Sequence, residues 1–375
     1  MERKKKLGSF YTPKIIADWI VKRVLSQKLI TSVLEPSCGD GAFISSLYSY
    51  KSDLSITAID IDDIAIKKVC QNFSHIKTIN QDFLFSDIQE KFDLIIGNPP
   101  YISKKNISQK QIEICRDIHV KNGLEEKEIS NMWTAFVVKS CLLVKPTGVL
   151  AFVLPAEFLQ VKYAKEIRDF IVAKFTRIEI LSFRNFRFEN TEQNTIVLIA
   201  YKDSKAKGVF FKEFNSVSEL NDDVIFQKSS LDEDMKWTAN CLTVAELNLI
   251  KKIKNNCAVH KIEDYCSAVA GIVTAANSYF IVDKNTMLKY NLKGYIKPII
   301  QKSYFVDKNI SFNKVNFQKL IKSGYPCFLL DLSSIPEQDF NPGLKNYLQL
   351  GVQQEINKRY KCKQRERWYD IPSIW

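Results

Sequence analysis

Phe92-Asp93-Leu94-Ile95-Ile96-Gly97-Asn98-Pro99-Pro100-Tyr101 is the most informative segment of this chain. Its apolar run, Leu94–Ile96, is typical of a buried parallel strand that ends at Gly97. The prolines that follow carry no N–H and cannot extend a sheet. In open α/β sheets, ligands bind at the carboxyl ends of the strands, so we expect the functional site beside Asn98.

The four residues after this strand form a hook with a specific chemistry. We expect the Asn98 side-chain oxygen and the Pro99 carbonyl to accept hydrogen bonds from a single amine. Pro100 fixes the turn, and Tyr101 can stack on the flat group that carries the amine. An amine on an aromatic or amide carbon is a poor nucleophile because its lone pair is delocalised, and two acceptors would free that lone pair. The alternative interpretation is a Pro-Pro turn that only ends a strand.

The composition is that of an ordinary globular protein, with 375 residues, 46% hydrophobic and 26% charged. No apolar run approaches the ~20 residues of a membrane span, and no signal-peptide core follows the basic N-terminus. We therefore expect a cytoplasmic protein without membrane contact. Nine scattered cysteines favour a reducing compartment. Because Cys257, His260 and Cys266 lack a fourth ligand, no metal site is expected.

The net charge of +12 is unevenly distributed along the chain. After residue 240 there are 20 lysines and arginines against 11 acids, whereas the preceding residues carry 34 against 31. Within Lys358–Arg367 alone, six residues are basic and one is acidic. This asymmetry indicates a polyanionic partner such as a nucleic acid, or else a solvated basic face.

A glycine-containing loop follows the first expected strand, Ser32–Glu35. Gly39 and Gly41 would let its backbone approach a ligand closely. The loop is no phosphate-binding P-loop, because Glu35 and Asp40 would repel a phosphate and no Gly-Lys-Ser/Thr follows. These acids suit a ligand with a positive end.

Two more acids follow the next expected strands, Leu54–Ile59 and His75–Asn80. Asp60 can accept hydrogen bonds from ribose hydroxyls. Asp82 can accept from an adenine amino group, with Phe83 covering the ring. A solvated loop carboxylate is the alternative for each acid alone, and their repetition at successive strand ends favours a nucleoside site.

The remaining chain predicts a helix capped by Thr12, with Pro13 as its first residue. The polar stretch 102–130 is either partly helical or a flap. Arg177–Phe183 and Thr195–Tyr201 are expected to be a closing pair of strands. Polar residues 202–239 are expected to contain the domain boundary, and Tyr279–Val282 is expected to be strand.

In their order along the chain, these motifs resemble the N6-adenine DNA methyltransferases of bacterial restriction–modification systems. The resembling subgroup has an N-terminal Gly-Ser-Phe-Tyr-Thr-Pro block, then the cofactor loop, then the Asn-Pro-Pro-Tyr hook and a C-terminal recognition domain. The resemblance implies a Rossmann-like doubly wound α/β sheet in residues 1–235. It also implies a smaller α+β DNA-recognition domain in residues 240–375, and S-adenosylmethionine as the cofactor.

By this resemblance, the residues implied to bind the cofactor are Tyr11, Thr12, Pro13, Glu35, Cys38, Gly39, Asp60, Asp82, Phe83 and Phe136. Asn98 and Pro99 would accept from the target amine, and Tyr101 would stack on the flipped base. Phe188, with Phe186 in reserve, matches the second aromatic that holds the base. Both belong to a stretch in which basic and aromatic residues alternate.

The C-terminal part resembles the family's recognition domain more loosely. Ala275 stands where the family has glycine, and the chain stops at Trp375 soon after a family block, which leaves open whether the domain is complete. The expected DNA contacts are Lys358, Arg359, Lys361, Lys363, Arg365 and Arg367.

The function implied is methyl transfer to adenine N6 in a specific sequence of double-stranded DNA, with the adenine flipped out of the stack. A further partner by this resemblance would be a cognate restriction endonuclease or a specificity subunit. Two alternatives remain: a cofactor-binding modification subunit that needs a separate specificity subunit, and methylation of a protein glutamine or an RNA guanine amine. The N-terminal block and the basic C-terminal third argue against the latter.

Overall fold

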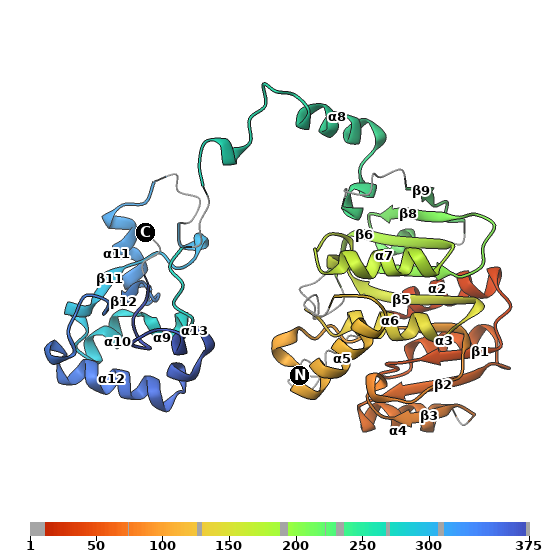
Figure 1. The fold of residues 1–375 in the computed structure, drawn as a ribbon, viewed down its shortest axis with the longest axis horizontal. Helices are drawn as coiled ribbons and strands as arrows, with labels where there is room; N and C mark the ends of the chain where they lie inside the picture. Colours follow the sequence, from red (N-terminus) through yellow and green to blue (C-terminus); the bar gives the residue numbers. More distant parts are fainter. Residues whose placement is uncertain are drawn as a thin grey trace. The chain divides into compact units, whose positions relative to one another are not determined.

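The computed structural model describes residues 12–73, 75–125, 130–187, 194–221, 223–229, 236–267, 271–306 and 311–372, without the side chains of residues 185–187 and 244. The chain divides into two compact units, Met1–Asn256 and Cys257–Trp375 (Figure 1). The polar stretch in which we expected a boundary lies within the first unit.

Nine strands of the described residues form the sheet of the larger unit, in the order β3-β2-β1-β4-β5-β7-β6-β8-β9. They are β1 (Ser32–Glu35), β2 (Ser55–Asp60), β3 (Lys77–Asn80), β4 (Phe92–Gly97), β5 (Val144–Pro155), β6 (Arg177–Arg187), β7 (Asn194–Tyr201), β8 (Gly208–Phe214) and β9 (Gln227–Lys228). Strand β1 pairs in parallel with both β2 and β4. The direction of strand order reverses there, which confirms the expected doubly wound sheet.

Helices cover both faces of this sheet. They are α2 (Lys14–Gln27), α3 (Ala42–Tyr50), α4 (Asp63–Asn72), α5 (Gln109–Lys121), α6 (Trp133–Leu143) and α7 (Ala164–Lys174), and α8 (Val244–Lys254) follows the sheet. Short 3-10 turns include η1 (Phe83–Phe85), η2 (Lys104–Asn106), η4 (Ala156–Leu159), η5 (Val217–Glu219) and η6 (Trp237–Cys241). Every helix in the described part of the chain is too short or too polar to cross a membrane.

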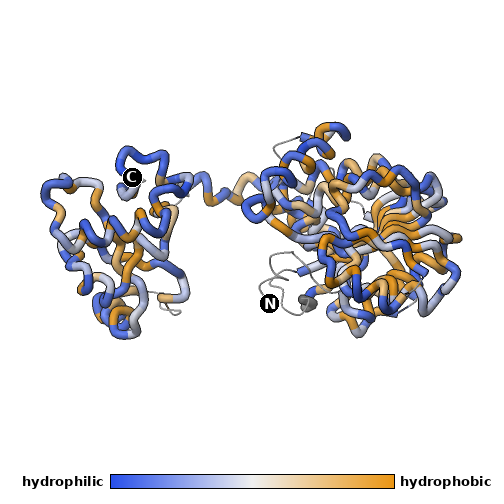
Figure 2. The backbone as a smooth tube through the Cα atoms, turned by 90° about the horizontal axis from the view of Figure 1, so that it is seen from below, coloured by the Kyte–Doolittle hydropathy of each residue, from blue (hydrophilic) through white to orange (hydrophobic). Residues whose placement is uncertain are grey.

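The alternation of side chains along β4 divides the core between the two faces. Leu94 and Ile96 are buried with residues of α2, α3 and α4, whereas Ile95 between them is buried with residues of α6 and α7. Side chains alternate across a strand, so one apolar run supplies both layers. The strands of the larger unit are correspondingly hydrophobic in Figure 2.

Helix α2 differs from expectation at its start. Helix α2 begins at Lys14 with Pro13 as its N-cap, one residue later than predicted, and the Pro13 carbonyl accepts from the amides of Ile16 and Ala17. Strand β5 begins at Val144 and runs through Lys145-Pro146-Thr147-Gly148, with an irregular register before Val149. A Cβ on Gly148 would lie 2.8 Å from Val144 Cγ1 and 2.9 Å from the Asp93 carbonyl, so glycine permits this close approach.

Strands β8 and β9 lie in the stretch 202–239, which composition alone presented as a polar connection. Strand β8 pairs in parallel with β6, and β9 pairs with β8 at the sheet edge. Most β8 side chains are half-buried, with Phe211 and Phe214 as the buried ones. Strand β9 at the edge consists of Gln227 and Lys228, which are both exposed, so its sequence carries no hydrophobic signal.

The smaller unit contains a three-stranded antiparallel sheet in the order β10-β12-β11, within the residues described. Its strands are β10 (Ile281–Val282), β11 (Ile296–Pro298) and β12 (Phe328–Leu330). Its helices are α9 (Asn277–Phe280), α10 (Lys284–Lys289), α11 (Lys314–Lys322), α12 (Pro342–Gln353) and α13 (Tyr360–Lys363), and its 3-10 turns are η7 (Ile262–Asp264), η8 (Lys293–Tyr295), η9 (Ser303–Val306), η10 (Glu337–Asp339) and η11 (Ile356–Lys358). This is the expected α+β class.

The prediction of a strand over Tyr279–Val282 is wrong in its first half, because Tyr279 and Phe280 are helical. The Tyr279 hydroxyl donates to the Tyr347 carbonyl (2.9 Å), and the Tyr347 hydroxyl donates to the Tyr279 carbonyl (2.7 Å). Their rings stack with centroids 4.8 Å apart. This reciprocal aromatic pairing with α12 outweighs the strand preference of the sequence.

Asp93 connects three strands at the end of the sheet opposite the hook. Its carboxylate accepts from the amides and hydroxyls of Thr31 and Ser32 at 2.7–3.1 Å, and Lys145 Nζ lies 3.0 Å away. These donors hold the pKa of Asp93 well below its usual range, against the opposing effect of burial. The ionised carboxylate therefore joins the beginnings of β1, β4 and β5.

We predict that Asp93→Asn lowers the free energy of unfolding by roughly 1–3 kcal/mol, because charged hydrogen bonds are removed from a largely buried site. A depressed carboxyl pKa contributes stability above the unfolded-state pKa, so the difference from wild type should be full above about pH 4 and shrink at lower pH. Chemical denaturation across pH measures this. Asp169→Asn, in an exposed pair with Lys165, is the control and should change little.

Candidate functional site

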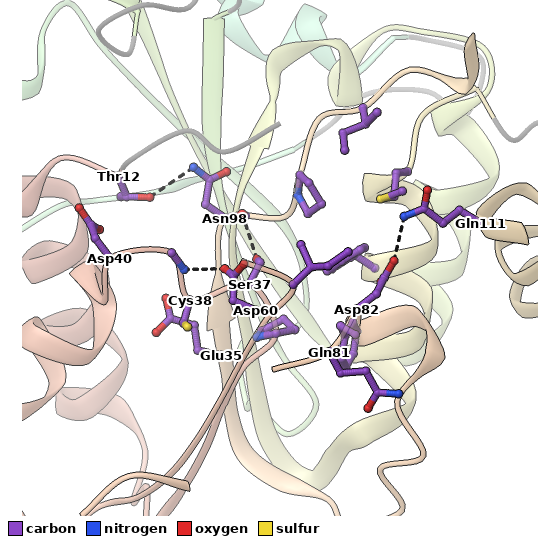
Figure 3. Close-up of a pocket in the computed structure, with 18 of the residues that line it drawn as sticks. Thr12, Glu35, Ser37, Cys38, Asp40, Asp60, Gln81, Asp82, Asn98 and Gln111 are labelled. Atoms are coloured by element: carbon purple, nitrogen blue, oxygen red, sulfur yellow. Dashed lines mark hydrogen bonds between the residues drawn. The ribbon is translucent and has the colours of Figure 1, made fainter. Parts of the chain in front are cut away.

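A cavity of about 380 Å³ opens at the carboxyl ends of β1, β2 and β4, beside the turn that follows β3 (Figure 3). Of the residues expected to bind a cofactor, those that line it are Thr12, Glu35, Cys38, Gly39, Asp60, Asp82, Phe83 and Phe136. Asn98 and Pro100 of the hook line the same cavity. The sheet therefore brings residues of the hook and these expected cofactor residues to one cavity.

One end of the cavity is acidic and contains a deeply buried carboxyl. Glu35 is 1% exposed, and its Oε2 has no hydrogen-bond partner among the described residues. Burial raises the pKa of Glu35 well above its ordinary value, and the carboxylates of Asp60 and Asp40 raise it further. A positively charged ligand would relieve both the desolvation and the repulsion.

The loop between β1 and α3 is fixed by Asp60 at the end of β2. Gly39 N donates to Asp60 Oδ2 and Asp62 N donates to Asp60 Oδ1, both at 2.8 Å. Gly41 adopts φ +83°, a left-handed conformation that favours glycine. Burial raises the pKa of Asp60, while the backbone donors oppose this rise. Each oxygen keeps a second lone pair, so the expected ribose contact stays a prediction.

The other end of the cavity is built around the turn η1. Asp82 Oδ1 accepts from Leu84 N (3.0 Å), and the Phe83 ring lies 5.3 Å from the Phe136 ring. From α6, Lys139 Nζ donates to the carbonyls of Phe83 (2.6 Å), Leu84 (3.1 Å) and Ser86 (2.6 Å). Burial lowers the pKa of Lys139 to about 8 against the attraction of two aspartates.

The sequence interpretation missed a contribution from α5, in the stretch where a flap was the alternative. Gln111 lines the cavity, and its Nε2 donates to Asp82 Oδ2 at 2.9 Å (Figure 3). Ser108 and Gln111 form the capping box that begins α5. The spacing Ser-x-x-Gln is a known helix-start signal and could have located this helix. Lys139 was also missed, although it is the single charged residue of helix α6, whose sequence is otherwise mostly apolar.

The hook is held from two sides. Asn98 Nδ2 lies 3.4 Å from Thr12 Oγ1, and Ser37 Oγ donates to the Asn98 carbonyl at 3.1 Å. The Tyr101 hydroxyl donates to the Val153 carbonyl of β5 at 3.1 Å. Burial, with Glu157 nearby, raises the pKa of Tyr101 well above its ordinary value, so its ring stays neutral.

Several predicted site residues are not found in the cavity wall. Tyr11 and Phe188 lie outside the described residues, and the side chain of Phe186 is not described. Pro13 caps α2, and neither Pro99 nor Tyr101 is among the residues that line the cavity. The roles of these residues therefore stay predictions.

The six basic residues near the C-terminus divide into two groups. Arg359 donates to the Ala275 carbonyl, Arg365 to those of Val273 and Thr274, and Arg367 to those of Leu332 and Ile335. These arginines thus hold the smaller unit together, and Lys358, Lys361 and Lys363 are exposed, as Arg359 is too. Ala275 adopts φ +67°, a conformation that explains the glycine expected at this position.

Two family models match the chain. The Eco57I restriction-modification methylase model matches residues 26–188, and the model of the Type II methyltransferase M.Eco57I, C-terminal domain, matches residues 234–375. The first covers the cofactor loop and the hook, and the second covers the smaller unit.

Known proteins are similar over most of the chain. The Type II methyltransferase M.AccI of Acinetobacter calcoaceticus is 27% identical over 391 residues, which cover 99% of this chain and 70% of the relative. M.HincII of Haemophilus influenzae is 26% identical over 326 residues, 85% of this chain and 57% of the relative. The chain thus spans only part of the length of these relatives.

A solved structure shares the fold. The Type ISP restriction-modification enzyme LlaGI, as a nuclease-deletion mutant in complex with a DNA substrate mimic, has a TM-score of 0.53 and 17% identity. The likeness covers 84% of this chain and 40% of that one.

We predict that Glu35→Gln weakens binding of S-adenosylmethionine at least about tenfold, because a contact to a buried carboxylate is worth roughly 1.5–3 kcal/mol. Because its pKa is raised, Glu35 takes up a proton as pH decreases, so the affinity of the wild type for the cationic ligand should decrease as pH decreases. Since the ligand favours the ionised carboxyl, binding should release a proton. Calorimetry in buffers of different ionisation enthalpy measures both. Glu90→Gln, on the surface opposite Lys77, is the control. Identical pH profiles for wild type and Glu35→Gln would contradict the assignment.

Proposed function

Since the two family models and the curated relatives identify the chain as a member of the restriction–modification DNA methyltransferases, we propose that it methylates the N6 amine of an adenine flipped out of duplex DNA. The observation that carries this proposal is that Asn98 and the buried Glu35 line one cavity. A hydrogen-bond acceptor for an amine on an aromatic ring and a site for a positively charged methyl donor thus lie in the same cavity.

The residues present fit S-adenosylmethionine as the methyl donor. Its positive charges match the buried carboxyl of Glu35 and the neighbouring Asp40 and Asp60. Its nucleoside matches the other end, where Asp82 offers acceptors and the Phe83 and Phe136 rings flank the turn. When bound, it supplies a methyl group activated by a cationic sulfur.

The hook would lower the barrier by orienting the amine and stabilising its developing charge. Asn98 Oδ1 and the Pro99 carbonyl each accept one amine hydrogen, which favours a pyramidal nitrogen with a free lone pair. Asn98 Nδ2 donates to Thr12 Oγ1 at 3.4 Å, so Oδ1 lies on the other side of the amide. The neutral Tyr101 ring stacks on the base. No general base is required, because positioned acceptors and alignment supply the catalysis.

The DNA is proposed to be held through the smaller unit as well. Lys358, Lys361 and Lys363 are exposed and can approach phosphates, whereas the arginines between them also support the fold. A basic unit attached to a catalytic one agrees with duplex DNA as the substrate.

We predict that Asn98→Ala lowers methyl transfer to DNA by ~10²–10³ while S-adenosylmethionine binding is retained, because the variant lacks one preorganised electrostatic interaction with the amine. Asn98→Asp keeps an acceptor oxygen and should retain more activity. Labelled-methyl transfer, followed by mapping of the modified base, measures rate and product together. Normal turnover in Asn98→Ala would show that the hook has no role in the mechanism. Label on any base other than adenine would contradict the proposed N6 specificity.

We also predict that neutralising Lys358, Lys361 and Lys363 together flattens the dependence of log affinity for DNA on log salt. The slope should fall by about 0.9 for each phosphate that the variant no longer neutralises. The control neutralises Lys67, Lys77 and Lys165, which form surface ion pairs in the larger unit. If the chain reads sequence by itself, specific DNA should bind at least ~10³-fold more tightly than random duplex. If the ratio of affinities for specific and random DNA is near one and rises when a second subunit is added, the chain is a modification subunit instead.

A further inference from the structure

We propose that Gln111 of α5 determines cofactor specificity: by holding the Asp82 carboxylate as an acceptor, it makes the site select an adenine ring over a hypoxanthine ring. This inference rests on the proposed function, since it assumes that the nucleoside of the methyl donor lies at the η1 end of the cavity. It assigns a role to a residue of the stretch that follows the hook.

The amide orientation of Gln111 is fixed by two sets of contacts. Its Oε1 accepts from Ser108 N (3.1 Å) and from Ser108 Oγ (3.0 Å) in the capping box. Its Nε2 donates to Asp82 Oδ2 at 2.9 Å. Because Ser108 N can only donate and the Asp82 carboxylate oxygen accepts, a rotated amide would break both of these contacts. The N–H donor therefore always points at Asp82.

Asp82 is engaged on both oxygens by donors. Leu84 N donates to Oδ1 and Gln111 Nε2 donates to Oδ2. A carboxylate has about four lone-pair positions, so two acceptor positions are left after these contacts. Asp82 therefore offers its remaining acceptor positions to the cavity that it and Gln111 line.

The turn that carries Asp82 cannot easily adjust to a different ring. Lys139 holds the carbonyls of Phe83, Leu84 and Ser86 from the side of α6. On the side of α5, Ile107 and Ser108 line the cavity next to Gln111. The donor and acceptor pattern at this end is therefore built into the fold.

Adenine and hypoxanthine differ in the ring substituent that would face Asp82. Adenine carries an amino group, which donates to a carboxylate, whereas hypoxanthine carries a carbonyl oxygen at the same position and would face Asp82 with two acceptors opposed. A site built to hydrogen-bond one group rejects the analogue that lacks it, because its own polar groups are then left without a partner.

The test compares Gln111→Glu with wild type. Glutamate keeps the acceptor for Ser108 but places an oxygen against Asp82, so the two carboxyls share a proton and Asp82 no longer presents only acceptors. Dissociation constants are measured by calorimetry for S-adenosylhomocysteine and S-inosylhomocysteine, without DNA. We expect wild type to prefer the adenosyl ligand at least about tenfold, and Gln111→Glu to reduce that preference at least about fivefold.

Two further variants separate specificity from folding. Gln109→Glu makes the same substitution on the same helix, at an exposed residue paired with Glu113, and should keep the wild-type preference. Gln111→Met removes the donor without adding charge and should also reduce the preference. An unchanged preference in both Gln111 variants, or an equal loss in Gln109→Glu, would overturn the inference.

The measurement distinguishes this inference from the proposed function. A protein that binds the adenosyl ligand selectively but transfers no methyl group to DNA contradicts the proposed function and leaves Gln111 with its role. A wild-type protein that transfers methyl groups yet binds both ligands equally contradicts the inference alone.

Discussion

The parallel pairing of β1 with β4 sets the layout of the larger unit and of its cavity. The register of this pairing places Val33 beside Leu94 and Leu34 beside Ile95. The residues that leave these strands, Glu35 on one and Asn98 on the other, must therefore emerge at the same edge of the sheet. The hydrogen bond from Ser37 to the Asn98 carbonyl joins the two loops beyond the strands. A hook for an amine and a loop for a cation are thus neighbours by topology.

The two ends of the cavity are prepared for a ligand in opposite ways. At the acidic end, Glu35 is buried beside other carboxylates, which costs stability until a positive charge arrives. At the η1 end, Asp82 already has a protein donor on each oxygen. The first end therefore gains electrostatic stabilisation on binding, and the second offers a preformed hydrogen-bond pattern. A site of this kind can combine affinity with selectivity.

The smaller unit separates structural from exposed basic residues by side-chain chemistry. The planar guanidinium groups of Arg365 and Arg367 each reach two or more backbone carbonyls through N–H groups held in a fixed plane. The exposed lysines of the same segment can instead contact the phosphates of a polyanion such as DNA. Arg359 also contacts the carbonyl of Ala275, whose left-handed backbone departs from the usual preference of alanine.

The motifs in the sequence, together with the family resemblance that they carry, were enough to predict the doubly wound sheet and about half of the residues that line the cavity. This was possible because Leu94–Ile96, Gly41 and the acids at successive strand ends are local signals of a buried strand, a tight turn and a loop. The remaining features required the folded chain. Gln111 and Lys139 act on Asp82 and its turn across long sequence separations, and the burial of Tyr279 depends on a partner 68 residues away. Contacts between distant segments leave no periodic trace in either segment, so local patterns cannot reveal them.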